Sequence, residues 1–99
     1  MERKHAKNLQ EIPINFTGII DFVDGSIRWF KNGLLHRESG PAVEYFDGSK
    51  EWYLEGKIIF STFPGFKFEI VHETENELCI EISGALFNVK KIPGIVSDE

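Results

Sequence analysis

Cysteine is nearly absent from this chain of 99 residues, since Cys79 is the single one. One cysteine allows no internal disulfide, which suits a reducing compartment. The chain has no apolar run near the roughly 20 residues that span a membrane. Its first residues, MERKHAKNLQ, lack the apolar stretch of a secretory signal. We therefore expect a soluble cytoplasmic protein.

Basic side chains are scarce, and the net charge is −5. The first ten residues hold Arg3, Lys4 and Lys7 against Glu2, so the other 89 carry 15 acidic and 8 basic side chains. Such a surface repels the phosphates of nucleic acids and of anionic membranes. We therefore expect direct binding to neither DNA, RNA nor a membrane.

The three histidines lie far apart in the sequence. His5, His36 and His72 are separated by 31 and 36 residues and lack the spacing of a metal site. No glycine-rich phosphate loop is present, because each glycine is explained by a turn. We expect neither a metal nor a cofactor.

One short stretch, His36, Glu38 and Ser39, contains the residue types of nucleophilic catalysis. Neighbours in a tight loop seldom bring a nucleophile and its base within hydrogen-bond reach. We expect His36 and Arg37 to fix this loop instead, and we expect no enzyme.

The chain does contain a repeat. The segments DGSIRWFKNG (24–33) and DGSKEWYLEG (47–56) are 23 positions apart and share five of ten residues. The preceding residues, 20–23 and 43–46, match in type at the same offset. Periods of this length indicate stacked structural units. We expect one domain over 1–99 with two such units in 17–60.

Each unit has the pattern of short strands joined by tight turns. Asp24-Gly25, Asn32-Gly33 and Asp47-Gly48 are typical of two-residue type I′ hairpin turns, and Glu55-Gly56 is a weaker version. The residues between them are aromatic or β-branched, as strands prefer. The predicted strands are 18–23, 26–31, 34–36, 42–46, 49–54 and 57–60.

Residues 66–90 alternate between apolar and polar side chains, the pattern of a sheet with one buried face. We expect a three-stranded antiparallel meander with turns at 72–76 and 83–84. The fold class is therefore all-β. Residues 1–12 and 93–99 are expected to be terminal arms, and a short helix is one interpretation of 1–12.

The repeat resembles a known family. The segment Trp29-Phe30-Lys31-Asn32-Gly33, followed by His36, Gly40 and Tyr45-Phe46-Asp47-Gly48, is similar to a MORN repeat. The segment HRESGPA (36–42) matches the divergent variant with HR-x-x-GPA. The resemblance covers about 17–60. It implies stacked hairpins that serve as a scaffold for protein contacts and, in some members, lipid contacts.

The aromatic residues of the repeat have two expected roles. One hairpin cannot bury its aromatic face alone, so a second copy should cover it. We expect Trp29 and Trp52 to be core residues that shield each other. Phe30 and Tyr53 follow them on the opposite face and are candidate partner contacts. Two units make a short stack, so 66–90 should cap it, or a homodimer should form through an open sheet edge.

Five glutamates without an intervening base lie within 13 residues: Glu69, Glu73, Glu75, Glu77 and Glu81. We expect them to point to water from one end of the second sheet. They form either a patch that docks on a basic cleft or a solvated face that keeps the sheet soluble. Cys79, between apolar neighbours, is expected to be buried and inert.

Three functional hypotheses follow. The first is a non-catalytic protein-binding module. The second is a small acidic inhibitor that blocks the basic cleft of a nucleic-acid enzyme, by analogy with proteins of phages and mobile elements that act against host defences. The third, a hydrolase that works through His36, has the least support.

Overall fold

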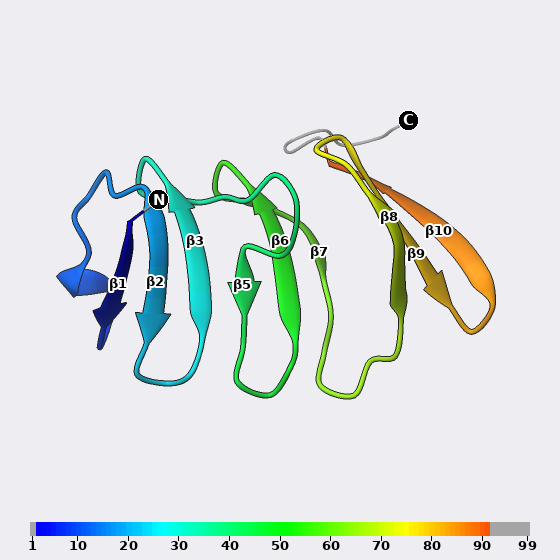
Figure 1. Cartoon of the computed structure of the whole chain (residues 1–99), viewed down its shortest axis with the longest axis horizontal. Coiled ribbons are helices and arrows are strands. Elements are labelled where there is room, and N and C mark those ends of the chain that lie inside the picture. The colour runs from blue at the N-terminus through cyan, green and yellow to red at the C-terminus, as the bar shows by residue number, and fades with distance from the viewer. Residues whose placement is uncertain (1, 92–99) are drawn as a thin grey trace.

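The computed structural model describes residues 2–91, and these residues are almost entirely β (Figure 1). The strands are β1 (Arg3–Ala6), β2 (Gly18–Phe22), β3 (Ile27–Lys31), β4 (Leu34–Leu35), β5 (Val43–Glu44), β6 (Lys50–Leu54), β7 (Lys57–Ser61), β8 (Glu69–Glu73), β9 (Glu77–Ile82) and β10 (Ala85–Lys90). A single 3-10 turn, η1, covers Leu9–Glu11. The all-β prediction is confirmed. The predicted arm at 93–99 lies outside the described residues.

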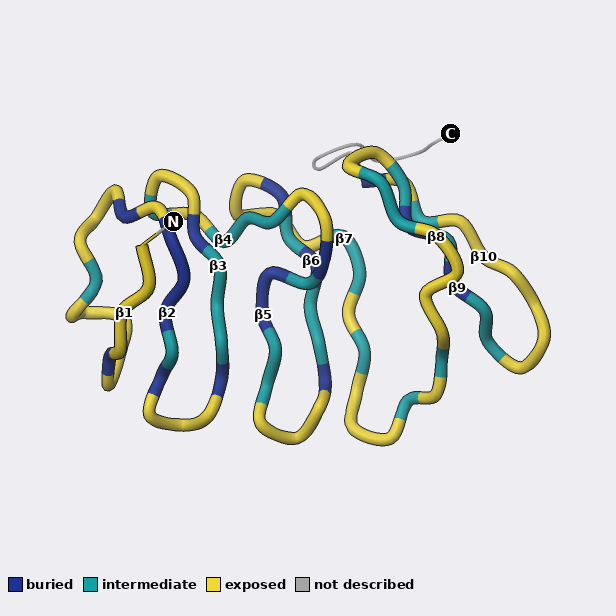
Figure 2. Tube along the Cα trace, in the orientation of Figure 1, coloured by how far each residue is buried: buried dark blue, intermediate teal, exposed yellow. Residues whose placement is uncertain are grey.

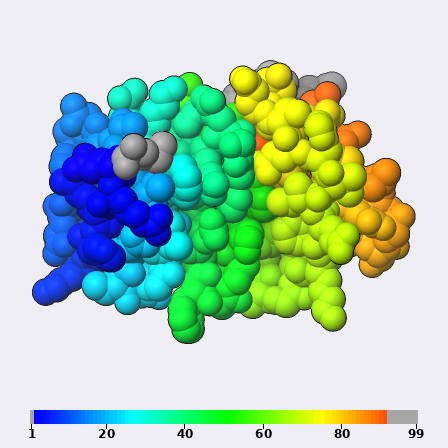
Figure 3. Space-filling model, viewed as in Figure 1, coloured from blue at the N-terminus to red at the C-terminus, as the bar shows by residue number. Residues whose placement is uncertain are grey.

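The strands form two sheets. The large sheet has the order β1-β2-β3-β5-β6-β7, with β4 beside β3, and the small sheet has the order β10-β9-β8. All pairs are antiparallel except β1 with β2. In the space-filling view, sequence order follows spatial order from one end of the molecule to the other (Figure 3). Residues 66–90 therefore end the stack as a separate sheet and do not extend the first one.

Strand β1 is the element that the sequence pattern did not predict. Its residues are mostly charged and exposed, so no hydrophobic period marks it. Two hydrogen bonds from the Arg3 guanidinium to Asp21, of 2.6 and 2.8 Å, fix its parallel pairing with β2. They also lower the pKa of Asp21. The helical interpretation of 1–12 is wrong except for the turn at η1.

The two Asp-Gly turns are not of type I′. Only their glycines have positive φ, 90° at Gly25 and 93° at Gly48, whereas type I′ needs two such residues. Phe22 N–H donates to the Ser26 carbonyl at 2.9 Å, which leaves a three-residue loop. Asp24 Oδ1 accepts from the Ser26 N–H and hydroxyl at 2.8 and 2.7 Å, and these bonds lower the pKa of Asp24. The second unit repeats this arrangement 23 residues later.

The other predicted turns do have two residues with positive φ. They are Asn32-Gly33, Glu55-Gly56 and Ser83-Gly84. The first two keep the period of the repeat and also close in the same way. Phe16 O accepts from Gly33 N–H and Leu35 O from Gly56 N–H, both at 2.8 Å. Each unit is thus tied to the chain segment that precedes it, which confirms the repeat at the level of hydrogen bonds.

Two hydrophobic cores lie on opposite faces of the large sheet, because alternate residues of a strand face opposite sides. The first core contains Ala6, Phe16, Ile20, Phe22 and Phe30, partly beneath the segment between β1 and β2. The second contains Trp52, Leu78 and Ile80 and joins the two sheets. Figure 2 shows buried stretches at both places.

The two tryptophans occupy the same face but have different surroundings. Trp52 is 1% exposed and packs edge-on against Phe60 and Phe68, with ring centroids 5.4 and 6.3 Å away. Trp29 is only half-buried, and the Arg37 guanidinium covers its ring at 3.8 Å. The expectation that the two indoles shield each other is wrong, because the small sheet and Arg37 supply their covers separately.

Candidate partner-binding surface

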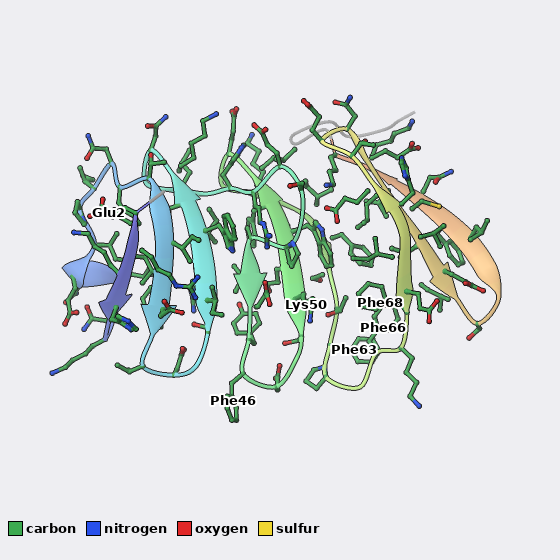
Figure 4. All side chains as sticks on the ribbon, in the orientation of Figure 1. Glu2, Phe46, Lys50, Phe63, Phe66 and Phe68 are labelled. Atoms are coloured by element: carbon green, nitrogen blue, oxygen red, sulfur yellow. The ribbon has the colours of Figure 1, made fainter. Side chains whose placement is uncertain are left out.

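A groove separates the turn before β6 from the small sheet and has a volume of about 560 Å³. We call it the aromatic groove, and its lining residues are Gly48, Lys50, Phe66, Lys67, Phe68, Glu69, Glu81, Ser83 and Gly84. Figure 4 shows Phe63, Phe66 and Phe68 one above another between β7 and β8, with Lys50 on the β6 side.

Three phenylalanines form a ladder from the surface to the core. Phe63 and Phe66 have ring centroids 4.9 Å apart, and Phe66 stacks on Phe68 at 5.4 Å with an interplanar angle of 23°. Phe68 in turn contacts Trp52. The outermost ring, Phe63, is 62% exposed. An exposed ring backed by a buried indole is held in place, so it loses little conformational entropy on binding.

A local turn brings the first two rings together. Phe66 N–H donates to the Phe63 carbonyl at 3.0 Å, and Gly65 supplies a φ of 83°. Proline presets the backbone for such a turn. The sequence analysis did not single out Phe63 or Phe66. The pattern Phe-Pro-Gly-Phe at 63–66 was the available signal, because a four-residue turn places its first and last side chains side by side.

A further exposed ring projects from the loop between β5 and β6 (Figure 4). Phe46 is 85% exposed, and its Cβ lies 2.9 Å from the place where a side chain on Gly25 would begin. Val23, its equivalent in the first unit, is also exposed. Exposed apolar residues thus recur at the loop tips of the repeat, beyond what the hairpins need for their own packing.

Glu73 does not point to water. Val71 is an extra residue in β8, and this bulge between Ile70 and His72 reverses which side chains face inward. Trp52 Nε1 donates to the Glu73 carboxylate at 3.0 Å, and Lys91 Nζ forms an ion pair with it. The expectation for Glu73 is therefore wrong, and its role is structural.

The other four glutamates remain at the surface to different degrees. Glu69 and Glu81 lie directly opposite each other in the register of β8 and β9. Glu77 is 3.5 Å from Lys90 Nζ, and Glu75 is exposed in the turn. The predicted cluster is therefore divided between the two ends of the small sheet.

Phe30 and Tyr53 are not the exposed contacts that the alternation predicts. Phe30 is 7% exposed, because the segment before β2 covers this face and brings Phe16 to a centroid distance of 6.3 Å. Tyr53 is half-buried and donates its hydroxyl to Glu51 Oε1 at 3.2 Å. Burial, followed by the Glu51 charge, raises the pKa of Tyr53.

Cys79 is also less buried than expected. It is half-buried, since the register of β9 places it on the face of Glu77 and Glu81 instead of that of Leu78 and Ile80.

His36 ties the two repeat units together, as the sequence analysis predicts. Its Nδ1 accepts from Glu55 N–H at 2.9 Å, so the ring proton is on Nε2, which lies 3.4 Å from the Glu38 carboxylate. Thr17 Oγ1 accepts from Asn32 N–H at 2.9 Å, the equivalent place one unit earlier.

We expect His36→Ala to lower the free energy of unfolding by about 1–2 kcal/mol, because Glu55 N–H loses its acceptor. Urea denaturation measures the change. The control is His72→Ala on the exposed face of β8, for which we expect less than about 0.5 kcal/mol. Equal effects of the two substitutions would contradict the bridging role of His36.

Neither a metal cluster nor a membrane span is found in the part of the chain that the structure describes. Residues 2–91 contain no group of three or more His, Cys, Asp or Glu side chains placed to hold a metal ion. Within the same residues no helix has the length and apolar character needed to cross a membrane. Comparison with known proteins found no matching family model, curated protein or solved structure.

Proposed function

We propose that this protein is a non-catalytic protein-binding module built on MORN-like hairpins, with the aromatic groove and the exposed Phe63 as its binding site. One observation carries the proposal: the ladder from Phe63 through Phe66 and Phe68 to the buried Trp52. A core needs no ring that is 62% exposed at its outer end. Preorganised aromatic side chains are typical anchors of protein interfaces.

The surroundings of the ladder fit a protein partner. Lys50 and Lys67 lie among the groove's lining residues, together with Glu69 and Glu81. An apolar surface among charges of both signs matches the usual anatomy of an interface, an apolar centre with a polar rim. Phe46, exposed at the neighbouring loop tip, offers a second apolar anchor.

The test is affinity capture from lysate with matched variants. The double variant Phe63→Ser/Phe66→Ser removes the outer ladder, and Ile14→Ser removes an apolar side chain that is 93% exposed elsewhere. We expect the wild type and Ile14→Ser to recover the same stoichiometric protein and the double variant to lose it. Equal recovery by all three would contradict the proposal, provided that the double variant retains the wild-type circular dichroism.

A second candidate function, the acidic inhibitor of a nucleic-acid enzyme, is favoured by the pair Glu69 and Glu81. Like charges directly opposite each other destabilise a sheet. Neither carboxylate forms an ion pair with another residue of 2–91. Attraction to a basic cleft would account for keeping both.

The electrostatic test must spare Glu73, because that carboxylate is structural. The triple variant Glu69→Lys/Glu75→Lys/Glu81→Lys should abolish binding to a basic enzyme and leave the fold unchanged. The wild-type affinity should also fall as salt rises. Unchanged affinity of the variant at low salt would exclude this function.

A further inference from the structure

We propose that two copies of this chain pair antiparallel along β10, about a two-fold axis at Phe87, to form a continuous six-stranded sheet. The inference rests on β10 alone and is independent of the proposed function, because no residue of β10 lines the aromatic groove.

The hairpin geometry determines which backbone groups of β10 are free. Ser83-Gly84 is a two-residue turn, so the flanking pair Ile82 and Ala85 exchange hydrogen bonds. The alternation continues along β10, and Lys91 N–H donates to the Asn76 carbonyl at 2.9 Å, as this phase requires. The N–H and C=O groups of Leu86 and Asn88 therefore point away from β9 and are available to another strand.

The edge strands of the two sheets differ in how they resist pairing. Charged residues, bulges and proline are the usual protections of an edge. Strand β1 carries Arg3, Lys4 and His5 in succession. Strands β7 and β8 each have a register irregularity.

Strand β10 has none of these protections over residues 85–89. It pairs with β9 without interruption, and the segment Ala-Leu-Phe-Asn-Val contains neither a charge nor a proline. Leu86 is 66% exposed and Phe87 is 48% exposed, on opposite faces of the strand. An edge with this composition is suited to strand addition.

Symmetry then selects a second copy as the occupant. Residues that face each other across a sheet share a face, so the two-fold register places Phe87 opposite Phe87 of the second copy. Leu86 lies opposite Asn88, and Ala85 lies opposite Val89. This pairing brings no like charges together and stacks two aromatic rings. The same operation on β1 would place basic side chains against one another.

Light scattering after size exclusion tests the proposal. Paired strands of this length bury less than a standard interface of about 1,600 Å², so the measured mass should rise with concentration towards twice 11.4 kDa. Asn88→Pro removes an outward N–H and leaves the bonds to β9 intact, so we expect a monomer. Asn88→Thr keeps that N–H and should still dimerise. A wild type that stays monomeric at every concentration, or a dimer that survives Asn88→Pro, would overturn the proposal.

A charge swap tests the register. Phe87→Lys and Phe87→Glu each place like charges on the axis, so each variant alone should be monomeric. An equimolar mixture should restore the dimer through a Lys–Glu pair at position 87. Failure of the mixture to associate would overturn the axis at Phe87. Unchanged emission from the buried Trp52 shows in each case that the fold is intact.

Discussion

Replacing Trp52 with alanine is expected to lower the free energy of unfolding by about 3–5 kcal/mol, the range for truncating a buried aromatic side chain. Trp52 is 1% exposed and contacts rings from both sheets, so its loss opens a cavity at their junction. It also removes the indole N–H that donates to Glu73. A domain with a typical total stability of about 5–15 kcal/mol would lose much of it.

Trp29→Ala is the matched control, because Trp29 occupies the same position in the first unit. Its ring is half-buried beneath Arg37, so we expect a loss of only about 1–2 kcal/mol. Guanidinium chloride denaturation, followed by circular dichroism, measures both variants. Equal losses would contradict the claim that the small sheet, and not the neighbouring repeat, buries the second indole.

Replacing Lys91 with methionine is expected to destabilise the fold by about 3–5 kcal/mol, because it breaks a buried ion pair and leaves a carboxylate behind. The Lys91 side chain is 1% exposed and that of Glu73 is 14% exposed. Lys91 Nζ also donates to the Glu38 carbonyl at 3.0 Å, which ties the end of the small sheet to the loop between the repeat units.

Two further variants separate the charge from the packing. In Lys91→Met/Glu73→Gln the buried charge is gone and an acceptor for Trp52 remains, so the double variant should regain part of the stability lost in Lys91→Met. Lys90→Met removes an exposed partner of Glu77 and should change the stability by less than about 1 kcal/mol. If Lys91→Met were no more harmful than Lys90→Met, the structural role of this pair would be wrong.

The repeat was predictable from sequence because its signals are local. The period of 23 residues, the turn glycines and the aromatic strands each reflect a backbone preference within a few residues. These preferences place β2 to β7 close to their observed bounds. The exact turn type at Asp24-Gly25 was less predictable, because Ser26 closes the loop with hydrogen bonds that a dipeptide rule does not include.

The errors arise where distant segments meet. The burial of Phe30 depends on Phe16, 14 residues earlier, and the inward turn of Glu73 depends on a one-residue bulge. Neither leaves a periodic mark in the sequence. The exposed face of Phe63 was missed for the same reason, since its orientation is set by the ladder to Trp52, a residue of the other sheet.

Site-specific photo-crosslinking tests the central claim, that Phe63 marks the surface to which a protein partner binds. A photoreactive phenylalanine analogue is placed at position 63 and, as a control, at position 14, which is 93% exposed on the opposite part of the chain's repeat region. Illumination in the native lysate should give one discrete adduct from position 63 and none from position 14. Adducts of equal yield from both positions, or none from position 63, would contradict the account.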